Sequence, residues 1–108
     1  MAEELGVFET IHSMRAMRRL KPDPVPTEMI RKIIDAGIRA PSGQNLQAWA
    51  FVVLREADNK KFFQERYYKA MVDRFGDRLK PKEDDKSSFA KTARAAIHLA
   101  EHMHEAPV

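Results

Sequence analysis

Four basic residues close together are the clearest candidates for binding an anion. Arg15, Arg18, Arg19 and Lys21 lie within one stretch of seven residues. Arginine side chains bind phosphate oxygens through paired hydrogen bonds, so a phosphorylated ligand or a nucleic-acid backbone is one interpretation. The other is a basic face exposed to water, which charge pattern alone favours.

A second candidate is the polar stretch "APSGQNLQAW" at residues 40–49. Ser42, Asn45 and Gln47 bring hydroxyl and amide groups, and Gly43 leaves the neighbouring backbone amides accessible. Such a loop can hold a polar ligand, or its side chains can satisfy its own backbone. Composition alone favours the second interpretation.

A third candidate, "HLAEH", matches the H-x-x-E-H arrangement of inverted zinc peptidases. His98 and His102 would share a helix face and could hold zinc, with Glu101 as the base. That chemistry needs another ligand further along the chain. Histidines late in a helix also favour its negative end, and His104 fits the same explanation, so we predict no metal site.

Four helices are expected to position these residues. Apolar residues recur at helical spacing over residues 7–17, and a three-proline connector follows. Thr27 is expected to cap the next helix, which ends at "APSG". Asp58 is expected to cap a third helix, which ends at Gly76. Its large apolar residues are Phe62, Phe63, Tyr67, Met71 and Phe75.

The last expected helix, "FAKTARAAIHLAEHMHE", is capped by Ser87 or Ser88 and is rich in alanine. Small side chains let another helix approach closely, which indicates an interior helix.

The segment "AWAFVVL" at residues 48–54 is predicted to be a buried strand, and it is the only convincing one. A lone strand leaves its backbone donors and acceptors unpaired, so something must pair with it. We therefore expect the chain to be a fragment or to need a partner copy.

Whole-chain properties limit the alternatives. The chain has 108 residues, a formal net charge of +3 and no cysteine. The length indicates one domain, and the charge is too small to imply nucleic acid by itself. Without a membrane-length apolar run or a targeting segment we expect a cytoplasmic protein with no membrane partner. G-x-G-x-x-G, P-loop and G-x-S-x-G motifs are absent.

Taken in order, "SMRAMRRLKPDPVPTEMIRKIIDAGIRAPSGQNLQAWAFVVL" resembles the N-terminal part of the FMN-dependent nitroreductase family. That family has an arginine-rich stretch, a P-V-P turn, a helix and an A-P-S-x-x-N-x-Q-P-W loop before its first core strand. "HLAEHMHEAPV" also resembles a family segment. The resemblance implies an α+β, nitroreductase-like fold, here a mostly helical N-terminal fragment with one clear strand. The expected domain is 1–108, a single nitroreductase-like domain that is incomplete at its C-terminus.

The resemblance also implies an obligate homodimer with FMN at the interface and chain ends exchanged between subunits. Arg15 and Arg18 are then expected to contact the FMN phosphate and flavin ring side, and Ala16 to contribute its backbone. Residues of the polar loop are expected to reach the flavin of the opposite subunit. These are Ser42, Gly43 and Asn45, with Gln47 in the same loop.

The chain departs from the family pattern at several positions. Met14 stands where arginine is frequent, Ala16 where serine is frequent, Leu20 where phenylalanine is usual, and Ala48 where proline precedes the tryptophan. The first two weaken phosphate binding. Family members also run to about twice this length, going by the usual range for single α/β domains.

Two functions follow. The first is an FMN-dependent oxidoreductase that transfers hydride from NAD(P)H to a nitroaromatic, quinone or similar small-molecule acceptor, in which no side chain need act as acid or base. The alternative is a non-enzymatic helical module that binds an anionic partner through the Arg cluster. For assembly, we predict a twofold dimer with the 93–100 helix segment at or near the shared surface and residues 42–47 close to the partner.

Overall fold

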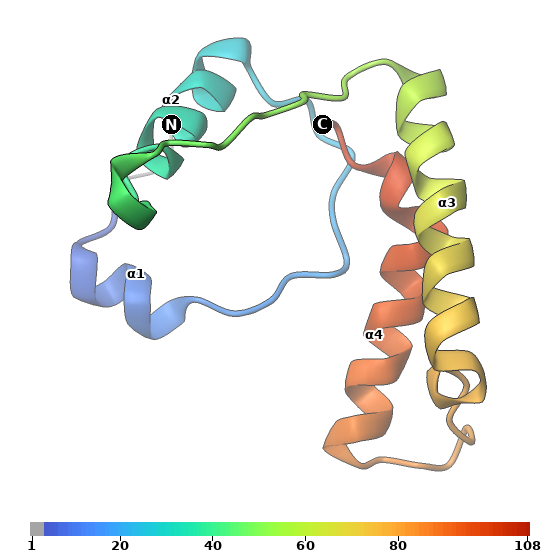
Figure 1. Ribbon diagram of the computed structural model, residues 1–108. Helices are drawn as coiled ribbons and strands as arrows, with labels where there is room; N and C mark the ends of the chain where they lie inside the picture. The colour runs from blue at the N-terminus through green and yellow to red at the C-terminus, as the bar shows by residue number, and fades with distance from the viewer. Residues whose placement is uncertain (1–3) are drawn as a thin grey trace.

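The computed structural model describes residues 4–108, and within this range the chain is helical with no strand (Figure 1). Four α-helices and three short 3-10 turns follow one another along the chain. They are α1 (Val7–Ser13), α2 (Thr27–Gly37), η1 (Gly43–Asn45), α3 (Ala57–Phe75), η2 (Gly76–Leu79), α4 (Ser88–His102) and η3 (Met103–Glu105). None of the described helices is long and apolar enough to cross a membrane.

α3 and α4 form an antiparallel hairpin in which the packing is concentrated (Figure 1). Gly76 ends α3 with a positive φ of 52°, a conformation that a residue without a Cβ adopts at little cost. Ser87 begins α4, because its hydroxyl accepts a hydrogen bond from the Ala90 amide at 3.1 Å. Both ends lie where the sequence predicted them.

Small side chains on one face of α4 form the centre of this hairpin. Ala90 and Ala100 are fully buried and Ala93 is nearly so. Their spacing places them on one side of the helix, which lets α3 approach closely. The expected close approach of another helix to the alanine face of α4 is confirmed, because α3 and the adjoining turns of the same chain cover that face. The rest of α4 is not enclosed, with Phe89 66% exposed, so the prediction of an interior helix holds for this one face only.

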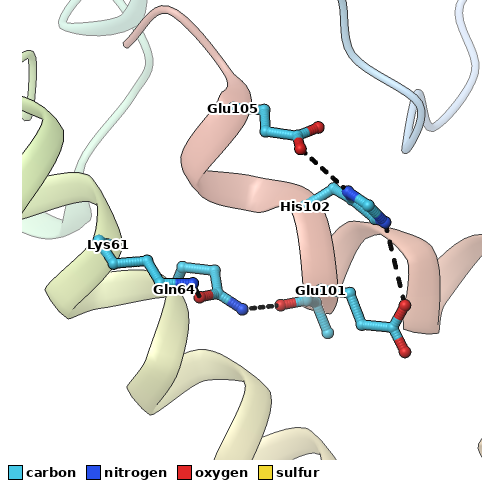
Figure 2. Close-up of polar contacts among 6 residues, drawn as sticks. Lys61, Gln64, Glu101, His102 and Glu105 are labelled. Atoms are coloured by element: carbon cyan, nitrogen blue, oxygen red, sulfur yellow. Dashed lines mark hydrogen bonds and ion pairs between the residues drawn. The ribbon is translucent and has the colours of Figure 1, made fainter.

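The side chain of Gln64 in α3 makes a hydrogen bond to α4 across the hairpin (Figure 2). Its side chain is 5% exposed, its Nε2 donates to the Ala100 carbonyl at 2.6 Å, and its Oε1 accepts from Lys61 Nζ at 3.2 Å. Phe62 and Phe63, which the apolar pattern assigned to the inner face, are instead about half exposed.

The N-terminal half of the chain is open. α1 and α2 pack on no other helix or turn within the described residues, although α2 has an apolar stripe that leaves Met29 and Ile33 about half exposed. The Cα radius of gyration is 16.9 Å, against about 13 Å for a compact domain of this size. The chain therefore leaves much of its apolar surface without cover.

An apolar hollow of about 620 Å³ lies between the N-terminal half and the hairpin. The α2 stripe, the segment at residues 51–54 and the ends of α3 and α4 line it. Lys60 is its one charged lining residue, and its Nζ donates to the Ala106 carbonyl at 2.8 Å. The described residues therefore leave these apolar side chains without cover on the side of the hollow.

The prediction of a strand at residues 48–54 is wrong for this structure. The segment runs uncoiled between η1 and α3 (Figure 1) and belongs to no strand. Strand formation requires a neighbour that accepts and donates backbone hydrogen bonds, and the described residues provide none.

Three helix starts or ends also differ from prediction. The first helix ends at Ser13 rather than near Met17. Thr27 does not cap α2, because Pro26 precedes the helix and the Thr27 hydroxyl instead accepts from Arg55 Nη1 at 2.7 Å. Asp58 lies inside the first turn of α3 and makes no capping hydrogen bond.

Candidate ligand-binding segments

The basic cluster lies on the irregular connector between α1 and α2. Arg15 Nε lies 3.4 Å from Met17 Sδ, and Arg18 is half buried. No ion pair found among residues 4–108 involves Arg15, Arg18, Arg19 or Lys21. Other arginines, such as Arg39 with Asp35 at 3.1 Å, do have a carboxylate partner. The cluster is therefore a local concentration of positive charge, which suits an anionic ligand.

Hydrogen bonds within the polar loop close it into a compact turn. The amide of Asn45 donates to the Ser42 carbonyl at 3.0 Å, and the amide of Gln47 donates to Ser42 Oγ at 3.2 Å. Gln47 Nε2 also donates to Asn45 Oδ1 at 2.8 Å. The loop thus satisfies part of its own polar groups, as one of the two sequence interpretations expected.

The backbone of this loop is strained at three residues that are not glycine. Gln44, Asn45 and Gln47 have φ values of 52°, 55° and 50°. A left-handed conformation costs an L-residue about 1–2 kcal/mol, and such residues cluster at binding sites. Gly43, the loop glycine, has no positive φ, and the space around its Cα is open. Glycine, the usual marker of positive φ, stands at none of these three positions, and Asn45 is the one residue among them whose type commonly tolerates it.

The two polar segments share no direct polar contact. No hydrogen bond or ion pair among the described residues joins the segment holding Arg15, Ala16 and Arg18 to the loop at residues 42–47.

His102 at the end of α4 forms a local polar network with Glu101 and Glu105 (Figure 2). The His98 and His102 rings stack with centroids 4.3 Å apart, and His102 Nδ1 lies 3.2 Å from Glu105 Oε1. This hydrogen bond, followed by the charges of nearby histidines, lowers the pKa of Glu105. Glu101 Oε2 lies 4.0 Å from His102 Nε2, and the buried His104 Nδ1 has no hydrogen-bond partner in the part of the chain that the structure describes.

Stacked imidazole rings do not point their nitrogens at a common centre. Among residues 4–108, no group of three or more histidine, cysteine, aspartate or glutamate side chains is placed to hold a metal ion. The helix-end interpretation of these histidines accounts for their contacts with Glu101 and Glu105.

Comparison with known proteins assigns the chain to a family. A family model described as the Nitroreductase family matches residues 11–108, which include both polar segments. The chain belongs to the nitroreductase family. This membership agrees with the resemblance carried by the arginine-rich stretch and the "APSGQNLQAW" loop.

Curated relatives carry names of oxidation–reduction enzymes. The chain is 45% identical to an NADH dehydrogenase from Thermus thermophilus over 51 residues, 47% of this chain and 25% of that relative. It is 34% identical over 70 residues to a putative NADH dehydrogenase/NAD(P)H nitroreductase from Methanothermobacter thermautotrophicus, with 64% and 37% covered. It is 36% identical over 58 residues to iodotyrosine deiodinase 1 from Rattus norvegicus, with 54% and 20% covered.

The matched segments are thus between about a fifth and somewhat more than a third of these relatives' lengths. No solved structure matches the chain significantly.

Proposed function

We propose that the protein is a flavin oxidoreductase that uses FMN to transfer hydride from NAD(P)H to a nitroaromatic, quinone or similar small acceptor. The observation that carries this proposal is the Nitroreductase family match across residues 11–108. The names of the relatives, NADH dehydrogenase and NAD(P)H nitroreductase, support the same class of reaction.

The chemistry of the two polar segments fits FMN. Guanidinium groups that have no carboxylate partner among residues 4–108 suit a phosphate, so Arg15 and Arg18 are proposed to bind it, with the Ala16 backbone nearby. When bound, FMN supplies the hydride-transfer chemistry, and the protein supplies binding and orientation. No acid or base from this chain is required.

The polar loop is proposed to line the flavin of a second subunit. Ser42, Gly43, Asn45 and Gln47 are the proposed residues, and the exposed, strained backbone of the loop supports a binding role. Among the described residues no polar contact ties this loop to the arginine segment, which is compatible with a site shared between two chains. A homodimer would also cover apolar surface that the single chain leaves exposed.

The amino-acid composition bears on the cellular compartment of the protein. A chain without cysteine fits a reducing compartment, so we propose that the protein is cytoplasmic.

A flavin titration of matched arginine variants tests these roles. Arg18→Gln removes a proposed phosphate contact and keeps a polar, uncharged side chain, whereas Arg39→Gln removes an exposed arginine that is paired with Asp35. Loss of one charge-assisted contact, worth about 1.5–3 kcal/mol, should weaken FMN binding by roughly 10- to 150-fold in Arg18→Gln only. Equal affinity in the two variants would remove Arg18 from the site.

The arginines of the basic cluster, which form no ion pair among the described residues, also support a second candidate function. In this alternative, the 108-residue chain is a non-enzymatic module that binds an anionic partner through Arg15, Arg18, Arg19 and Lys21. Phosphate contacts release counterions, so binding of single-stranded oligonucleotide would fall steeply with added salt. Salt-insensitive binding, or no binding, would eliminate this function while leaving the flavin proposal untouched.

A further inference from the structure

The imidazole ring of His102 lies between two carboxylates at the end of α4 (Figure 2). Its Nδ1 lies 3.2 Å from Glu105 Oε1, and its Nε2 lies 4.0 Å from Glu101 Oε2. A neutral imidazole carries one N–H and one lone pair, so one of its nitrogens turns a lone pair toward a carboxylate. The protonated ring donates at both nitrogens. Both contacts are therefore attractive only when the ring is protonated.

Two further histidines limit how many protons this end of α4 can hold. The rings of His98 and His102 stack with centroids 4.3 Å apart, and two positive charges at that separation repel each other. His104 Nδ1 is buried and has no hydrogen-bond partner within residues 4–108. A proton on that nitrogen would be a buried donor without an acceptor. His102 is therefore the histidine of this group whose protonation creates attractive contacts.

α3 brings its own polar side chains to the same end of α4. These are Lys60, Lys61, Glu65 and Tyr68. Lys61 Nζ donates to Gln64 Oε1 at 3.2 Å, and none of the four side chains forms an ion pair with Glu101 or Glu105 in the described part of the chain. η2 packs on α4 at the opposite end of the helix (Figure 1). Among the described residues, the cation that pairs with both carboxylates is therefore the His102 ring.

The turn that carries Glu105 leads directly to a packed part of the hairpin. Ala106 is 7% exposed, its amide donates to the Met103 carbonyl at 3.2 Å, and its carbonyl accepts from Lys60 Nζ at 2.8 Å. Because Glu105 immediately precedes Ala106, the contact between Glu105 and His102 holds η3 at the point where the chain meets α3.

We propose that His102 is a proton-operated latch for η3, closed when its protonated ring bridges Glu101 and Glu105 and open when the ring is neutral. In the closed state, Ala106 stays packed against α3. In the open state, the His102 contacts weaken and the Ala106 amide exposes itself to water more often. The latch contains no residue proposed to bind FMN, so it goes beyond the proposed function and does not depend on it.

The latch is expected to be closed over a limited range of pH. The hydrogen bond with His102 lowers the pKa of Glu105, so its contribution to stability is present above the ordinary carboxyl pKa and is lost as pH falls through the lowered value. At the other limit, an imidazolium loses its proton in the range of about pH 5–8. η3 should therefore be held more firmly in mildly acidic solution than in alkaline solution.

Amide hydrogen exchange of Ala106 measures the latch directly, because this amide is hydrogen-bonded inside the turn. The protection factor is compared at about pH 5.5 and pH 8. The His102 side chain is 42% exposed, so the contact is a modest one, and the protection factor of the natural chain should fall by about two- to fivefold at the higher pH. His102→Gln should show equal protection at both pH values.

Two more variants separate the latch from a general effect of pH. Glu105→Gln keeps all the histidines and should also abolish the pH dependence, whereas His12→Gln, an exposed histidine of α1, should retain it. Equal protection of the natural chain at both pH values would overturn the proposal. A pH dependence that persists in His102→Gln or in Glu105→Gln would overturn it as well.

The pKa of Glu105 gives an independent check. Measured by carbon NMR of the carboxyl group, it should lie below the ordinary value in the natural chain and return toward that value in His102→Gln. An equally low pKa in both proteins would contradict the latch. Failure of either experiment would leave the flavin proposal untouched, because flavin uptake is measured separately.

Discussion

Replacing Gln64 with alanine should weaken the packing of α4 against α3 and lower the free energy of unfolding. The substitution removes the donor to the Ala100 carbonyl and the acceptor of Lys61 Nζ, at a side chain that is 5% exposed. A buried polar group left without its partner costs about 1–3 kcal/mol. At about 4–8 °C per kcal/mol for a chain of this size, the melting temperature should fall by roughly 5–20 °C.

Thermal unfolding followed by far-ultraviolet circular dichroism measures this change. The matched control is Glu65→Ala, the next residue of α3, which is exposed and makes no hydrogen bond or ion pair through its side chain among the described residues. It should stay within about 0.5 kcal/mol of the natural chain. Equal melting temperatures for Gln64→Ala and Glu65→Ala would refute the claim that Gln64 holds the hairpin together.

Three further predictions concern the hairpin and its ends. Ala93→Leu should destabilise the chain by about 1–3 kcal/mol in denaturant unfolding by overpacking a nearly buried site, and the half-buried Ala96→Leu should cost less. Gly76→Ala should cost about 1 kcal/mol in the same assay because φ is positive there. A hydrogen bond from the Ser87 amide lowers the pKa of Asp85, so its stabilising effect exists above the ordinary carboxyl pKa and is lost as pH falls through the lowered value. Asp85→Asn should therefore be the less stable protein at neutral pH and equally stable in acid, and a constant difference across pH would contradict this.

Local signals in the sequence were sufficient for the facing ends of the two hairpin helices, though not for their packing against each other. Gly76 and Ser87 mark the ends of α3 and α4 through backbone freedom and a capping hydroxyl, which depend only on adjacent residues. The alanines of α4 predicted close packing through their size. These features need no knowledge of the distant chain.

The features that depend on distant partners could not be predicted in the same way. Residues 48–54 have the composition of a strand, but a strand exists only when a second segment pairs with it. The burial of Gln64 depends on its hydrogen bond to the Ala100 carbonyl across the hairpin. The apolar pattern of α3 does not reveal this partner, and it indicated Phe62 and Phe63 as buried residues instead. In the polar loop, the residues with a left-handed backbone are Gln44, Asn45 and Gln47, so no glycine marks these positions in the sequence.

The candidate site was recognised by motif rather than by geometry. The two segments that the nitroreductase resemblance singled out lie inside the matched residues 11–108, but no polar contact among the described residues joins them. The order of the motifs can be read from the sequence alone, so the family could be identified from it. The roles of Arg15, Arg18 and the loop depend on contacts with a ligand and stay predictions.

Reduction of bound flavin tests the central claim most directly. The protein expressed from its full coding sequence is purified, its absorption spectrum is recorded with added FMN, and NAD(P)H is then supplied without oxygen. The proposed function predicts a flavin absorption band that bleaches with NAD(P)H and returns when a nitroaromatic or quinone acceptor is added. A protein that takes up no FMN, or whose bound flavin stays oxidised with both NADH and NADPH, would contradict it.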